Sequence, residues 1–139
     1  MLIFTKNRKE RKAMSVYISP SGEGSLTARI SGEIDHHSAR WLRMDIDTAL
    51  NDNHPNHLIL DFSSVTFMDS SGVGLVMGRY KNMKAMGGTV ELAGMPPYIE
   101  KVMTLAGMDK LVKMSEQNGQ KKQSEALSVT EKGKEDING

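Results

Sequence analysis

The chain of 139 residues contains no cysteine, which excludes both a disulfide framework and a thiolate metal site. Long apolar runs are also missing, and the longest, a few residues each, cannot form a transmembrane helix. Near the start, Leu2, Ile3 and Phe4 are followed directly by charge and are too few for the apolar region of a signal peptide. Together these absences predict a single domain in the reducing cytoplasm.

The chain has almost no excess charge, with a net value of +1, but its basic residues are unevenly placed. Residues 1–13 hold five basic residues against Glu10, a balance of +4, which leaves −3 for the rest. Such an arm can touch nucleic acid or a membrane, although more often it is a solvated terminus, and the body favours neither partner. We predict a basic extension over 1–13, a domain over 14–131 and a disordered polar tail over 132–139.

From Met14 onward, strand-like alternation and helix-like spacing of apolar residues follow one another. The expected strands lie at 16–18, 26–30, 58–60 and 90–92, and the expected helices lie around 39–50, 73–83 and 99–105. A weaker strand at 111–112 and a weaker helix over 120–131 follow. The order β-β-α-β-α-β-α predicts an α/β fold with a small mixed sheet of four or five strands.

The most informative segment is Met68–Val73, where two serines stand between an aspartate and a glycine before the second helix. Asp69 or Ser70 suits the N-cap, because either side chain can accept a bond from a free amide. We expect Ser70 to cap the helix with its hydroxyl partly shielded, and Ser71 to point outward from the first turn. A phosphate on Ser71 would add about two negative charges and face free amides, so the segment suits a switch.

Three aspartates are expected near this segment. Asp35 precedes the first helix, Asp61 follows the central strand, and Asp69 belongs to the segment itself. Strand ends that feed helices converge at one edge of a sheet, so the three carboxylates are expected to surround Ser71. Capping of the first helix is the alternative role of Asp35, and the sequence leaves both roles open.

Three glycines within residues 72–78 resemble a dinucleotide-binding fingerprint, with Glu91 at about the spacing of a ribose-binding acid. The third glycine is one residue late, and Ser63–Asp69 separates the glycines from the predicted strand. A small nucleotide-binding or hydrolytic enzyme that uses the glycine-rich turn 72–78 is therefore the alternative function rather than the main one.

Other catalytic and metal-binding patterns are weak. Position 69 is Asp, so the serines lack the Gly-x-Ser-x-Gly setting of a hydrolase nucleophile. His36 and His37 are adjacent and face different directions on a helix, which makes them a poor metal pair. We predict no catalytic residue, no metal site and no bound cofactor.

A family resemblance is carried by Gly32–His37, Leu58–Phe62 and Phe67–Gly72, and Gly78–Lys81, Gly87–Gly88 and Val102–Leu111 extend it. Over roughly residues 14–115 the chain resembles anti-sigma factor antagonists (anti-anti-sigma factors) of the STAS-domain family, in particular those of sporulation. The resemblance implies a small mixed sheet with helices mainly on one face. It also implies a cytoplasmic regulator of transcription and not an enzyme.

The resemblance further implies a phosphorylation switch. Family members bind an anti-sigma factor, a serine kinase with its own ATP site, and so release the sigma factor. The kinase phosphorylates the second serine of the motif, Ser71 here, and the phosphorylated form no longer binds until a phosphoprotein phosphatase restores it. Residues 69–72, Asp-Ser-Ser-Gly, favour this class over the STAS domains of anion transporters and stressosome scaffolds. Sporulation and stress pathways are not distinguished.

The partner surface is expected to surround Ser71, because a phosphate abolishes binding only if it lands in or beside the interface. Asp35 and the first turn of the second helix should form it, with Val73 and Leu75 exposed beside the buried stripe. The full set of predicted partner-binding residues is Asp35, Asp69, Ser70, Ser71, Gly72, Val73 and Leu75. Neither nucleic acid nor a membrane is an expected partner.

Overall fold

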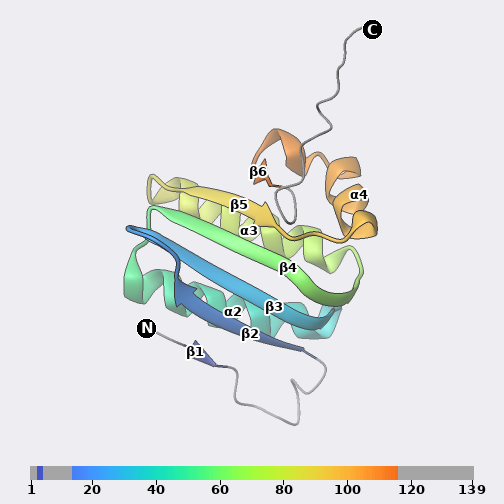
Figure 1. The fold of residues 1–139 in the computed structure, drawn as a ribbon, viewed down its shortest axis with the longest axis horizontal. Coiled ribbons are helices and arrows are strands. Elements are labelled where there is room, and N and C mark those ends of the chain that lie inside the picture. The colour runs from blue at the N-terminus through green and yellow to red at the C-terminus, as the bar shows by residue number, and fades with distance from the viewer. Residues whose placement is uncertain (1–2, 5–13, 116–139) are drawn as a thin grey trace, which may run out of the picture.

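In the computed structural model, which describes residues 3–4 and 14–115, a six-stranded sheet forms the centre of the fold (Figure 1). The strands lie side by side in their order along the chain. They are β1 (Ile3–Phe4), β2 (Met14–Pro20), β3 (Ser25–Ile34), β4 (His57–Met68), β5 (Thr89–Ala93) and β6 (Lys113–Met114). The first three strands pair antiparallel and the last four parallel, so the sheet is mixed, as predicted.

One face of the sheet is apolar, because side chains alternate along each strand. Val16 of β2 lies opposite Ile30 of β3, and Leu60 of β4 lies opposite Leu92 of β5, and all four are fully buried. The helices α2 (His36–Asn53) and α3 (Ser71–Ala85) cover this face (Figure 1). The expected arrangement of helices mainly on one face is therefore confirmed, and the core lies between these helices and the sheet.

The C-terminal part of the domain contains α4 (Pro97–Leu105) and the short 3-10 helix η1 (Met108–Lys110). Because η1 continues through residue 110, the last strand begins at Lys113 instead of at the predicted position 111. β1 adds a strand that the sequence did not predict. The predicted helix over 120–131 and the tail over 132–139 lie outside the described residues.

The main departure from prediction is the length of β4, which has 12 residues and ends at Met68, not near Leu60. The second half of β3 supports this extension, because it pairs with β4 up to Met68 across two register shifts. Only Asp69 and Ser70 then separate β4 from α3. The predicted separation of the glycines from the strand by Ser63–Asp69 is therefore wrong.

The helix α3 is rotated relative to its predicted apolar stripe. Its buried residues are Gly72, Leu75, Val76, Arg79 and Met83, whereas Val73, Met77 and Tyr80 are partly buried. Leu75 is only 4% exposed, so the prediction that it is exposed is wrong. Arg79 can occupy the buried face because Asp47 of α2 forms an ion pair with it at 2.9 Å.

Candidate functional site

The ends of β3 and β4 bring two of the three predicted aspartates together. Ile34 lies opposite Met68, and the amide of Asp69 donates a hydrogen bond to the carbonyl of Ile34 (3.0 Å). Asp35 and Asp69 therefore stand where neighbouring strands pass into α2 and α3.

Asp61 does not join this pair of aspartates. It lies well before the end of β4, roughly 20 Å from Met68 at the usual rise per strand residue. Its carboxylate lies 3.9 Å from the Arg29 guanidinium and accepts a hydrogen bond from the Ser63 amide. The prediction of three carboxylates around Ser71 is wrong, because β4 continues past Asp61.

Asp35 is the N-cap of α2. Its Oδ1 accepts a hydrogen bond from the Ser38 amide (2.8 Å), and the Ser38 hydroxyl accepts one from the Asp35 amide (3.0 Å), which completes a capping box. The bond from the Ser38 amide is the main cause that lowers the pKa of Asp35 below its usual value. The capping role is confirmed, and a role in partner binding stays a prediction.

The side chain of Asp69, and not that of Ser70, satisfies the start of α3. Oδ1 of Asp69 accepts a hydrogen bond from the Ser71 amide (2.8 Å). Ser70 occupies the N-cap position with φ −64° and ψ −13°, is exposed and makes no side-chain capping bond. A capping hydroxyl usually needs an extended backbone, which Ser70 lacks. The prediction that Ser70 caps the helix with a shielded hydroxyl is therefore wrong.

The first amides of α3 already have partners. The Gly72 amide donates to the carbonyl of Asp69 and the Val73 amide to that of Ser70, each at 3.0 Å. With the bond from the Ser71 amide to Asp69, three successive donors are occupied. The expectation that a phosphate on Ser71 would face free amides is wrong for these three.

None of the three glycines within residues 72–78 lies in a phosphate-binding turn. A Cβ on Gly72 would lie 2.3 Å from Sδ of Met68, so the Met68 side chain fills the space that a larger residue at the helix start would need. At Gly74 and Gly78 nothing lies within 4 Å of that position, and both line a groove. The turn between β4 and α3 itself contains no glycine, which a dinucleotide site would need there.

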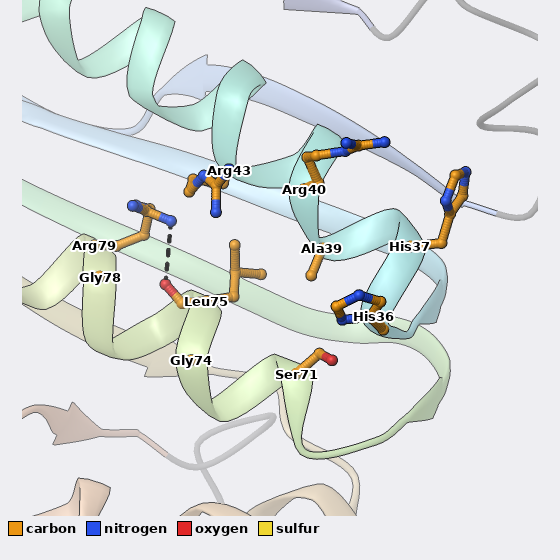
Figure 2. Close-up of a pocket in the computed structure, with 10 residues that line it drawn as sticks. All are labelled: His36, His37, Ala39, Arg40, Arg43, Ser71, Gly74, Leu75, Gly78 and Arg79. Atoms are coloured by element: carbon orange, nitrogen blue, oxygen red, sulfur yellow. Dashed lines mark hydrogen bonds between the residues drawn. The ribbon is translucent and has the colours of Figure 1, made fainter.

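This groove of 610 Å³ lies between α2 and α3, and we call it the α2/α3 groove (Figure 2). Half-buried Ser71 lies at one end of it, beside His36 (Figure 2). The lining residues are His36, His37, Ala39, Arg40 and Arg43 of α2, and Ser71, Gly74, Leu75, Gly78 and Arg79 of α3. Five of the ten are histidine or arginine and none is acidic, so the groove is basic.

The arginines of the groove differ in their surroundings. Arg79 is buried and held by Asp47, and burial lowers its pKa while Asp47 opposes that effect. Arg40 and Arg43 are exposed, and the Arg40 guanidinium lies 5.4 Å from the centre of the Trp41 ring. The groove was not predicted from the sequence, although positions 36, 40 and 43 lie on one face of a helix and together indicate a basic surface.

A second polar cluster lies on the opposite face of the sheet. His57 Nε2 lies 3.0 Å from Oε1 of Glu91, and Nδ1 lies 2.6 Å from the Thr89 hydroxyl. Burial raises the pKa of Glu91, but hydrogen bonds from His57 and Ser115, together with the charges of Lys113 and His57, bring it below its usual value. Within residues 3–4 and 14–115 no group of three or more metal-ligating side chains is suited to hold an ion. In the same ranges no helix is long and apolar enough to cross a membrane.

Similarity to known proteins covers most of the described domain. A family model described as the STAS domain matches residues 18–120. The chain is 35% identical to the anti-sigma F factor antagonist of Paenibacillus polymyxa over 89 residues, which are 64% of this chain and 76% of that protein.

Two solved structures are similar throughout the fold. The anti-sigma factor antagonist SpoIIAA in its unphosphorylated form is 30% identical with a TM-score of 0.64, over 81% of this chain and 92% of that one. The phosphorylated form of SpoIIAA, a Bacillus cell fate determinant, is 30% identical with a TM-score of 0.60, over 81% and 96% of the two chains.

Proposed function

This chain belongs to the STAS-domain family, and from that membership we propose that it is an anti-sigma factor antagonist. Its unphosphorylated form binds an anti-sigma factor that is a serine kinase, and the sigma factor is released. Phosphorylation of Ser71 ends the binding, and a phosphoprotein phosphatase restores it. The similarity to the Paenibacillus antagonist and to both forms of SpoIIAA supports this proposal.

The observation that carries the proposal is the position of Ser71. It is the first residue of α3, it is half-buried, and it lines the α2/α3 groove near two helix starts. The bond that holds the turn uses the Ser71 amide and the Asp69 carboxylate. A kinase can therefore modify the hydroxyl without breaking that bond, so the modified protein keeps its fold.

We propose that the partner contacts the first turn of α3 together with the start of α2. The side chains available for contact there are those of Asp35, Asp69, Ser70 and Ser71, together with partly buried Val73. The buried residues Gly72 and Leu75 contribute by holding the turn in place, not by direct contact.

A phosphate in this surface would oppose binding through charge and bulk. It adds about two negative charges close to the carboxylates of Asp35 and Asp69. An interface that covers these groups would have to desolvate all of them, which is costly unless each charge finds a partner. The phosphorylated form therefore binds the anti-sigma factor poorly.

The nucleotide in this proposal belongs to the kinase partner, and this chain carries no cofactor. Because the partner controls transcription, the proposed site of action is the cytoplasm. The alternative, a nucleotide-using enzyme built on residues 72–78, is an outcome of the experiment below.

The decisive experiment mixes the purified chain with an anti-sigma factor kinase and ATP, followed by intact-mass and fragment mass spectrometry. One phosphate per chain, located on Ser71, is expected. Ser71→Ala should bind the anti-sigma factor and resist inactivation, whereas Ser71→Asp should bind poorly and keep an unchanged circular dichroism spectrum. Ser70→Ala is the matched control and should still accept phosphate on Ser71.

Two results would overturn the proposal. Phosphate found only on Ser70 would refute the assignment of the switch residue. Hydrolysis of ATP or GTP by this chain alone, abolished by a substitution within residues 72–78, would instead support the enzyme.

A further inference from the structure

We propose that the chain itself binds the phosphate on Ser71, through His36 and Arg40 at the near end of the α2/α3 groove. The inference rests on the proposed phosphorylation of Ser71 and adds an internal binding site for a phosphomonoester dianion. The same groove that lies open in the unmodified protein becomes occupied in the modified one.

Donors of the right kind line the same groove as the Ser71 side chain. Ser71 and His36 line the same end of the groove, and the Ser71 side chain extends into it (Figure 2). Arg40 follows His36 by one helical turn, about 6 Å along the axis. In Figure 2 its guanidinium points away from Ser71, so a change of rotamer has to bring it to the phosphate. Imidazole and guanidinium N–H groups are both donors to phosphate oxygens, and guanidinium can bind two oxygens at once.

The backbone amides at this position are not free to bind the phosphate. The amides of Ser71, Gly72 and Val73 donate to Asp69 or to backbone carbonyls. A phosphate on Ser71 would have to break these bonds to use the helix start. Side chains across the groove are therefore the donors that remain.

The distribution of charge around the groove favours binding of the phosphate to side chains of α2. Arg79 is already paired with Asp47, but within residues 14–115 neither Arg40 nor Arg43 lies in an ion pair. The acids nearest in sequence to His36 and Ser71 are Asp35 and Asp69, and each carboxylate accepts a backbone amide bond. His37 completes the titratable groups of the lining. The dianion is repelled by the two aspartates and drawn toward the histidines and unpaired arginines.

This internal contact gives the modification a second effect on the partner surface. The phosphate adds negative charge at the helix starts and also withdraws the cations of the groove from any acidic side chain of the partner. The unmodified groove would attract such side chains, and the modified groove would not. The switch would thus remove an attraction as well as add a repulsion.

The test places phosphoserine at position 71 during translation by amber suppression, so it does not depend on the kinase. The ³¹P resonance is then titrated between about pH 4.5 and 8, because the second pKa of phosphoserine is about 6. The same protein unfolded in urea is the reference. A cation about 5 Å from the phosphate in a water-like dielectric lowers that pKa by about 0.6 unit. We expect a lowering of at least half a unit in the folded protein, reduced by added salt.

Variants separate the groove from other causes. The double variant His36→Gln with Arg40→Gln should abolish the lowering, and exposure of both side chains means that folding is retained. Arg29→Gln, on the opposite sheet face, is the control and should keep it. A native titration that matches the unfolded reference would overturn the inference. So would a lowering that survives the double variant, since the amides would then be responsible. The kinase experiment can fail without affecting either result.

Discussion

Gly72→Ala is the substitution whose effect the structure defines most sharply. The new methyl group would lie 2.3 Å from Sδ and 2.5 Å from Cγ of Met68, inside any allowed contact distance. These atoms belong to the flexible side chain of Met68, which is only 4% exposed and would have to repack against its buried neighbours. Overpacking of this kind costs about 1–3 kcal/mol. Alanine regains up to about 1 kcal/mol through its higher helix propensity. We expect a net loss of about 1–2 kcal/mol in the free energy of unfolding.

Urea denaturation followed by circular dichroism measures this loss, and the thermal midpoint should fall by roughly 3–10 °C. Gly74→Ala is the matched control in the same helix, because nothing lies within 4 Å of its added methyl group. The control should be neutral or stabilising by up to about 1 kcal/mol. Both substitutions change one glycine to alanine, so the difference between them isolates the contact with Met68.

A third variant decides whether that contact is the cause. Met68→Ala removes the obstructing atoms, so Gly72→Ala should cost much less in its presence than in the wild-type chain. The reasoning is refuted if Gly72→Ala and Gly74→Ala have equal effects. It is also refuted if the cost of Gly72→Ala is the same with and without Met68.

Three further predictions concern caps and charges. Asp69→Ala should cost about 1 kcal/mol through loss of the bond to the first amide of α3, whereas Ser70→Ala should change the urea midpoint by less than about 0.5 kcal/mol. Asp35→Ala should also cost about 1 kcal/mol at neutral pH. Because folding lowers the pKa of Asp35, its contribution to the free energy of unfolding is complete above the unfolded pKa of about 3.9. That contribution disappears as the pH falls through the lower folded value, which urea titrations at several pH values would detect. Asp47→Ala should lower the thermal midpoint by an amount equivalent to about 3 kcal/mol, because it leaves the buried guanidinium of Arg79 without its carboxylate.

Local signals predicted much of the fold. The residues at the start of α2 specified a cap, since the Asp35 carboxylate and the Ser38 hydroxyl each accept a hydrogen bond from the other residue's backbone amide, only three positions away. The alternation in β3 and the apolar run of β4 specified buried strands for the same reason. Such features depend on neighbours in sequence, which a sequence displays directly.

Features that depend on distant pairing were not predictable in the same way. The second half of β4 contains Ser63, Ser64 and Thr66, and β3 holds it as a strand through non-local pairing with register shifts. The length of β4 in turn decides that Asp69 satisfies the start of α3 and that Asp61 lies far away. The rotation of α3, which buries Leu75, depends on the ion pair between Arg79 and Asp47 of another helix.

The order of the strands bears on how the protein forms during synthesis. From β2 to β6, each strand pairs with the strand before it in the chain, so no strand has to be inserted between two others that have already paired. Sheets with this connectivity can grow as the chain leaves the ribosome, at about 5–20 residues per second. The surface around Ser71 is built from the ends of β3 and β4 and the helices that follow them. Its residues therefore all precede β5 in the chain, and α4 adds to it later, when the Tyr98 hydroxyl accepts a hydrogen bond from the Met68 amide at the end of β4.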